Sequence, residues 1–155
     1  MTQTEKELLL RDLCARLPYG VKIVIQDTFK YSTVLHEYHV LEVSNFSDIF
    51  CFNYKKFDKS MKKAMRERPN DIVIKPYLFP MSSMTDEQLF EVQEILGKNK
   101  IKIEDGFLSI VDSDRNTISY LEILTLLEWF YKNHFDIYGL IPMGLAIDAT
   151  GLNIY

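Results

Sequence analysis

Two residues with acid–base chemistry, His134 and Asp136, lie two positions apart in the sequence. An imidazole close to a carboxylate can act as a general base for a nucleophile. No serine or cysteine in a nucleophile motif accompanies the pair, and no glycine cluster predicts a phosphate-binding loop. A histidine near the end of a predicted helix is also typical of a capping residue. The sequence therefore favours a non-enzymatic protein and predicts no catalytic residue and no cofactor.

Two further patterns match metal sites only in part. Residues 112–116 alternate acidic and amide side chains as a calcium loop does, but Thr117 stands where that loop requires glycine. His36 and His39 are three residues apart in a strand-like context, which places them on opposite faces. A zinc protease needs two histidines four apart on a helix. The sequence therefore predicts no metal site.

The strongest local charge lies in residues 55–68. This segment of fourteen residues carries seven basic side chains against two acidic ones, for a net charge of +5 in a chain of −4. The basic residues are Lys55, Lys56, Lys59, Lys62, Lys63, Arg66 and Arg68. Phe57, Met61, Ala64 and Met65 recur at the spacing of one helix face.

The chemistry of residues 55–68 is compatible with several partners. A basic helical face can neutralise nucleic-acid phosphates, lie on an anionic membrane or bind an acidic protein. A solvated excursion between two strands, docked by its two methionines, is the alternative that is typical of charge runs. Nucleic-acid or anion binding through this segment is therefore one hypothesis for the function.

The overall composition is that of one compact domain. The chain has 155 residues, 47% of them hydrophobic, and this fraction argues against disorder. Cys14 and Cys51 lie far apart, and we interpret them as small buried hydrophobes rather than a disulfide or zinc pair. No apolar run approaches the roughly 20 residues that cross a bilayer, so we expect a cytoplasmic protein without a membrane partner. The sequence does not predict the oligomeric state.

Three helices are predicted from their starts. A serine or threonine followed three residues later by Glu or Gln forms a capping box, and this pattern occurs at Thr4, Thr85 and Ser119. Pro18 ends the first helix. The third contains the only tryptophan and is apolar on most sides, so we expect it to be largely buried.

Strands are predicted from alternating and β-branched residues at 21–26, 31–43, 48–53 and 71–75, and the second is expected to be bent or bulged. With no helix between most of them, they are expected to pair antiparallel. Asp105 and Gly106 predict a hairpin within residues 101–110.

These elements predict an α+β fold. The sheet is expected to be a small antiparallel sheet or an SH3-like half-open barrel, packed with an N-terminal helix, a middle helix and a buried C-terminal helix. Residues 1–155 are expected to form one domain, with a helix and a β-rich part at 1–80 and a helical part with one β-hairpin at 81–155.

The connector at residues 75–84 is unusually apolar for a loop. It contains Tyr77, Phe79, Met81 and Met84 among prolines. Exposed apolar side chains on a loop are typical of a binding surface. These four residues are therefore the predicted protein-binding site.

Three stretches also carry a resemblance: KELLLRDLCARLPYG (6–20), IKPYLFPMSSMTDEQ (74–88) and NHFDIYGLIPMGLAIDA (133–149). Together they resemble a family of small uncharacterised proteins from anaerobic gut bacteria and their prophages. In that family an arginine often precedes the glycine of the third stretch, where this chain has Tyr138. The resemblance implies a phage or mobile-element origin and brings no activity, cofactor or catalytic residue with it.

The function predicted from the sequence is a protein-binding or adaptor module of phage or mobile-element origin that contacts another protein. Nucleic-acid binding through residues 55–68 is the first alternative. An enzyme that uses His134 and Asp136 is the second.

Overall fold

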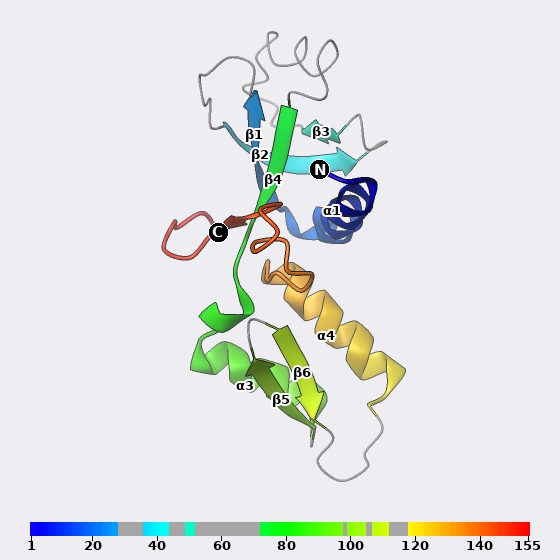
Figure 1. The fold of residues 1–155 in the computed structure, drawn as a ribbon. Helices are drawn as coiled ribbons and strands as arrows, with labels where there is room; N and C mark the ends of the chain where they lie inside the picture. Colours follow the sequence, from blue (N-terminus) through cyan, green and yellow to red (C-terminus); the bar gives the residue numbers. More distant parts are fainter. Residues whose placement is uncertain (28–35, 44–48, 52–71, 98, 105–106, 112–117) are drawn as a thin grey trace.

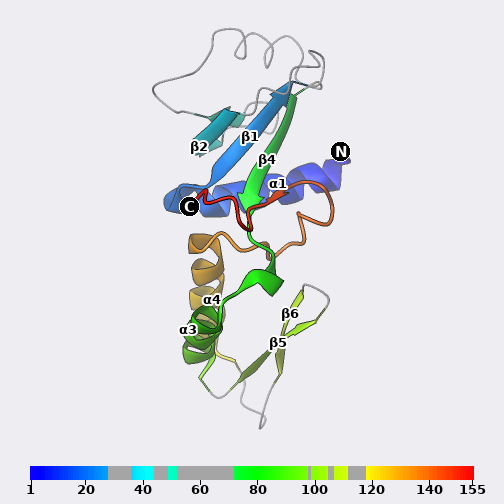
Figure 2. The same ribbon diagram turned by 90° about the vertical axis from the view of Figure 1, so that its left-hand side faces the viewer.

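A computed structural model describes residues 1–27, 36–43, 49–51, 72–97, 99–104, 107–111 and 118–155 of the chain. The fold is α+β, as predicted. A sheet and helix α1 lie at one end of the molecule, and helices α3 and α4 with a β-hairpin lie at the other (Figure 1). The same two-part arrangement is visible after a quarter turn (Figure 2).

The sheet has five strands in the order β3-β2-β1-β4-β7. Strands β1 (Lys22–Asp27), β2 (His36–Val43), β3 (Ile49–Cys51) and β4 (Ile72–Leu78) pair antiparallel, which confirms the predicted pairing. The register of β2 shifts between Val40 and Glu42, where a bulge was expected. Strand β7 (Ile147–Asp148) lies parallel to β4, and the sheet stays open. An SH3-like barrel is therefore not formed.

Strand β4 is longer than predicted, because it continues through Pro76 to Leu78. Pro76 lies opposite Ile23 of β1. A proline fits in a strand where its missing N–H would point away from the paired neighbour. On the other side of β4, only Tyr77 and Leu78 pair with β7, so no ladder bond is lost at Pro76.

Helix α1 (Gln3–Arg16) begins two residues earlier than predicted. Its capping box is formed by Thr2 and Glu5, and the expected box of Thr4 and Glu7 lies inside the helix. Both pairs have the same spacing, and the earlier start adds two residues to the helix. Cys14 is exposed on α1, so its predicted burial is wrong.

The two faces of the sheet are covered by different segments. Leu9 and Leu13 of α1 cover the face of Ile23 and Ile25, together with Leu140 from the C-terminal tail. The opposite face is covered by the last residues of the chain; its buried cluster is Val24, Tyr77, Ala149 and Ile154. The tail therefore seals the sheet from both sides, passing beside β4 (Figure 1).

The other end of the molecule has its own core. Helices α3 (Asp86–Leu96) and α4 (Tyr120–Lys132) share a cluster with the connector and the tail. Its buried members are Met81, Val92, Leu96, Leu126, Phe130 and Phe135. Strands β5 (Lys100–Glu104) and β6 (Phe107–Val111) form the predicted hairpin, with Glu104 opposite Phe107.

The caps of α3 and α4 are as predicted. The side chains of Thr85 and Ser119 each accept a hydrogen bond from the amide of the third helical residue. The side chain of that third residue in turn accepts a hydrogen bond from the amide of the cap. At its other end, α4 closes with His134 in a left-handed conformation (φ 58°). The amide of His134 donates to Tyr131 O and that of Phe135 to Phe130 O, and the rings of Phe130 and Phe135 meet edge to face. This is a Schellman motif with histidine at the position that usually holds glycine.

Candidate protein-binding face

The predicted acid–base pair does not form a catalytic arrangement. His134 and Asp136 are 6% and 5% exposed. Both carboxylate oxygens of Asp136 accept backbone hydrogen bonds, from Leu140 N and Ile141 N, each at 2.8 Å. Nδ1 of His134 has no hydrogen-bond partner. Asp136 therefore holds the tail in its turn and does not orient the imidazole.

The predicted binding residues of the connector lie mostly inside the molecule. Tyr77 is 7% exposed and Met81 is 3% exposed, so the expectation that they are exposed is wrong. Phe79 and Met84 are partly buried and pack against the same clusters. The connector is apolar because it belongs to the core, where its two ends join the sheet cluster and the helical cluster.

Other predicted site residues lie outside the described part of the chain. These are all seven basic residues of the segment 55–68 (Lys55, Lys56, Lys59, Lys62, Lys63, Arg66 and Arg68), and the partial calcium-loop pattern at 112–116, which predicted no site, lies outside it too. Nucleic-acid binding through the basic segment stays a prediction. Among the residues that the structure describes, no group of three or more His, Cys, Asp or Glu side chains could hold a metal ion.

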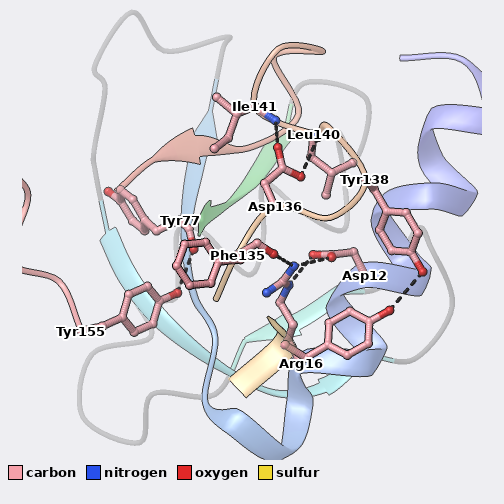
Figure 3. Close-up of polar contacts among 10 residues, drawn as sticks. Asp12, Arg16, Tyr77, Phe135, Asp136, Tyr138, Leu140, Ile141 and Tyr155 are labelled. Atoms are coloured by element: carbon pink, nitrogen blue, oxygen red, sulfur yellow. Dashed lines mark hydrogen bonds and ion pairs between the residues drawn. The ribbon is translucent and has the colours of Figure 1, made fainter. Parts of the chain in front are cut away.

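A buried arginine joins α1 to the end of α4. Arg16 is fully buried, and its Nε and one Nη each donate to Asp12 at 2.8 Å (Figure 3). The same Nη donates to the carbonyl oxygen of Phe135 at 2.6 Å. The guanidinium lies 5.2 Å from the ring centroid of Tyr131 on α4. These contacts fix the C-terminal end of α4 against α1.

The buried charges of this junction, on Asp12 and Arg16, form an ion pair. Burial raises the pKa of Asp12, and the hydrogen bonds and charge of Arg16 oppose that rise. The hydroxyl groups of Tyr131 and Tyr138 share a hydrogen bond at 3.0 Å, and burial raises the pKa of Tyr131. Tyr138 thereby joins the tail to α4.

Three stretches that are far apart in the sequence meet at this junction. Phe79 N donates to His134 O at 2.9 Å, and Asp136 N donates to Phe79 O at 2.8 Å. Arg16, from the first of the three stretches, joins the junction by donating a hydrogen bond to Phe135 O. Residues from 6–20, 74–88 and 133–149 therefore form one interior joint between the two ends of the molecule.

Tyr155 lies beside the junction and contacts His134, Tyr77 and Lys22. Its ring stacks on His134 at 3.7 Å between centroids, and its hydroxyl donates to Tyr77 O and accepts from Lys22 N. Burial raises the pKa of Tyr155 to about 12. Burial, with the charges of Arg16 and Lys22, lowers the pKa of His134 to about 4. His134 is therefore neutral at physiological pH.

The N-terminal half of α4 carries a cluster of exposed apolar side chains. Tyr120 and Leu121 are 76% and 73% exposed, and Ile123 and Leu124 are 40% and 39% exposed. Residues three and four apart on a helix are surface neighbours, so these four side chains are adjacent over the first turn and a half. We call this surface the α4 face.

The exposure of the α4 face corrects the prediction that α4 is largely buried. Only Leu126 and Phe130 of the helix are buried. The junction holds the C-terminal end of α4, and the N-terminal end extends away from the sheet (Figure 1). The capping box of Ser119 pairs two backbone amides of that end, those of Ser119 and Glu122.

Acidic side chains lie on α4 and on the neighbouring helix α3. Glu128 follows Leu124 by four residues on α4 and is its surface neighbour, whereas the carboxylate of Glu122 is held in the capping box of Ser119. Glu91 of α3 is held beside α4 by a 2.9 Å hydrogen bond from Trp129 Nε1. Three more acidic residues of α3 are exposed: Asp86, Glu87 and Glu94.

Sequence reasoning missed this surface because an apolar helix was taken to be a buried one. The sequence did contain an indication of this surface, because apolar residues extend around a wide part of the helix circumference. Tyr120, Leu121, Ile123 and Leu124 span more of the helix circumference than one packing neighbour covers. α3 packs beside α4 through the cluster that contains Leu126 and Phe130.

Comparisons with known proteins do not assign this face. No family model, no curated protein and no solved structure matches the chain. Within the described residues, no helix combines the length and apolar character needed to span a membrane.

Proposed function

We propose that this chain is a non-enzymatic protein-binding module, and that the α4 face is its binding surface. The observation that carries the proposal is the exposure of Tyr120 and Leu121, 76% and 73%, on a helix that is otherwise well capped. Contiguous exposed apolar side chains with a polar rim are typical of protein interaction sites. In line with the family resemblance, we place this activity in a phage or mobile-element context.

The α4 face has the properties of an effective binding surface. It lies on a helix that is anchored at its other end by buried contacts, so partner binding requires little ordering of the backbone. Tyr120 is a large amphipathic side chain of the kind that often dominates binding energy. Full burial of a large aliphatic side chain stabilises a complex by about 1.5–3 kcal/mol. The α4 face offers two such side chains, Leu121 and Leu124.

Site-specific photo-crosslinking tests this proposal. A photoreactive amino acid is placed at Leu121 in one variant and at Leu152, 49% exposed in the tail, in the matched control. Both are introduced in cells that express the chain. We expect a discrete protein adduct from position 121 and none from position 152. Equal labelling at both positions, or none at 121, would contradict the proposal.

A second experiment shows that the adduct depends on apolar contact. Leu124→Gln in the crosslinking variant should abolish the adduct while the melting temperature changes little, because Leu124 is partly exposed already. An adduct that survives this substitution would point to a polar contact near the helix and not to the α4 face.

A further inference from the structure

We infer that residues 149–155 form an acid-sensitive strap, which opens when His134 takes up a proton and thereby uncovers an apolar face of the sheet. That face includes Val24 and Tyr77, which the strap covers in the closed state. The strap and this face are distinct from the α4 face, so the opening does not depend on whether the α4 face binds a protein.

The strap is held by few contacts. Two of its side chains, Ala149 and Ile154, are buried. Tyr155 Oη donates to Tyr77 O at 2.9 Å (Figure 3) and accepts from Lys22 N at 3.0 Å. Lys22 Nζ donates to Ile154 O. Segments with few buried side chains open locally at a lower cost in free energy than the core, so the strap can open while the rest of the fold persists.

Tyr155 covers the imidazole of His134. The two rings stack with 3.7 Å between their centroids and an interplanar angle of 13°. His134 is 6% exposed, whereas Tyr155 is 41% exposed, so the tyrosine ring lies between the imidazole and solvent. Opening of the strap therefore gives water access to the imidazole.

The backbone of His134 is fixed on both sides of the residue. Its amide donates to Tyr131 O at 3.2 Å, and its carbonyl oxygen accepts from Phe79 N at 2.9 Å. These two bonds tie His134 to α4 and to the connector, which belong to the helical end of the molecule. The strap is thus the side of the stack that is displaced more readily.

The cations near His134 disfavour a proton on the closed imidazole. Arg16 of α1 and Lys22 of β1 act on it as positive charges. Like charges and burial both oppose the charged form of a side chain. A proton on the imidazole therefore destabilises the closed state, and exposure to water relieves that cost.

The buried carboxylates of the junction are already engaged. Asp12 is paired with Arg16, and both oxygens of Asp136 accept hydrogen bonds from backbone amides. β4, α4 and the strap contribute tyrosines to this region, which are uncharged in neutral and acidic solution: Tyr77, Tyr131 and Tyr155. These groups do not neutralise an imidazolium in the closed state.

The linkage between proton uptake and opening sets the expected size of the effect. Burial, with the charges of Arg16 and Lys22, lowers the pKa of His134 to about 4 from an ordinary value of 6.5. The closed strap is therefore fully favoured above about pH 6.5 and loses stability as pH falls toward 4. Between pH 7.5 and 4.5, the equilibrium constant for opening should rise by up to roughly 70-fold.

Hydrogen exchange followed by NMR tests the inference on the full chain. The amide of Lys22 reports on the strap, because it donates to Tyr155 Oη, and the amide of Val92 inside α3 reports on global unfolding. We expect the protection factor of the Lys22 amide to be lower than that of Val92 at every pH. Between pH 7.5 and 4.5 it should fall by up to roughly 70-fold.

Histidine variants identify the group that takes up the proton. His134→Asn tolerates the left-handed backbone and should remove the pH dependence of the Lys22 amide. The matched control combines His36→Asn and His39→Asn, which replaces the other two histidines of the chain and should leave the pH dependence in place.

Two variants of Tyr155 separate the ring from its hydroxyl. Tyr155→Ala removes the cover, so the pKa of His134, measured from its NMR chemical shifts, should rise from about 4 toward 6.5. Tyr155→Phe keeps the ring, and the pKa of His134 should stay closer to that of the native chain.

Three results would each overturn the inference. One is a protection factor at Lys22 that does not change with pH, or a pH dependence that survives His134→Asn. Another is equal protection at Lys22 and Val92 at every pH, which would show that the strap opens only when the whole protein unfolds. The third is a pKa of His134 that stays near 4 in Tyr155→Ala, which would show that Tyr155 is not the cover.

Discussion

Replacement of Arg16 by methionine should destabilise the protein strongly, because it leaves the carboxylate of Asp12 buried and unpaired. Both side chains are fully buried, and their two hydrogen bonds are 2.8 Å long. Removal of one partner from a buried pair costs about 3–5 kcal/mol. Against a total of about 5–15 kcal/mol for a whole protein, this is a large share of the stability.

Replacement of both residues separates the cost of an unpaired charge from the value of the pair. The double variant Asp12→Leu with Arg16→Met leaves no buried charge, and hydrophobic substitutes for a buried pair are often neutral. The carbonyl of Phe135 still loses its donor, at a cost of about 1 kcal/mol. We therefore expect the double variant to be more stable than Arg16→Met alone by about 2–4 kcal/mol.

Urea unfolding followed by the fluorescence of Trp129, the only tryptophan, measures these free energies. Lys132→Met, at an exposed position on α4, is the control and should change stability little. The pH dependence gives a second readout. In Arg16→Met, burial keeps the pKa of Asp12 above its unfolded value, so the contribution of Asp12 to stability is most favourable below about pH 4 and is lost as pH rises. A single variant that loses less than about 1 kcal/mol, or a double variant at the sum of both losses, would refute this reasoning.

The remaining predictions concern single caps and contacts. His134 has a pKa of about 4 when folded and about 6.5 when unfolded, so stability should fall as pH drops through that window. His134→Asn, which tolerates the left-handed backbone, should lose this dependence in pH-dependent urea unfolding; an unchanged slope argues against burial of a neutral imidazole. Ser119→Ala should lower the unfolding free energy by about 1 kcal/mol through loss of the cap, and a neutral result in thermal unfolding would mean that this end of α4 frays already. Tyr155→Phe removes the hydroxyl between Lys22 N and Tyr77 O and should cost about 1–2 kcal/mol by urea unfolding, whereas no loss would show that water replaces it.

Local sequence signals predicted the elements well. The capping boxes at Thr85 and Ser119 placed two helix starts correctly, because a cap is made by residues three apart. Asp105 and Gly106 predicted the hairpin for a similar reason. The first helix start was two residues off, since Thr2 has the same spacing to Glu5 as the predicted pair.

Features set by distant contacts could not be predicted in this way. Strand β7 has two residues, and its pairing with β4 joins positions about 70 apart in the chain. Arg16 and Asp12 have the spacing of an exposed helical pair, and nothing local shows that both are buried. The α4 face depends on how far the neighbouring elements reach along the helix. Such outcomes follow from packing, which a periodic pattern does not specify.

The tail that covers both faces of the sheet has a consequence for biosynthesis. Leu140 completes one buried cluster and Ile154 the other, so neither face is sealed until residues 140–154 have been synthesised and have left the ribosome. Until then, Ile23, Ile25 and Val24 lack cover that in the native state comes from more than one hundred positions away. Such non-local closure slows folding and leaves apolar strands exposed to aggregation. Nascent chains of this protein are therefore expected to depend on chaperones until translation has passed the tail.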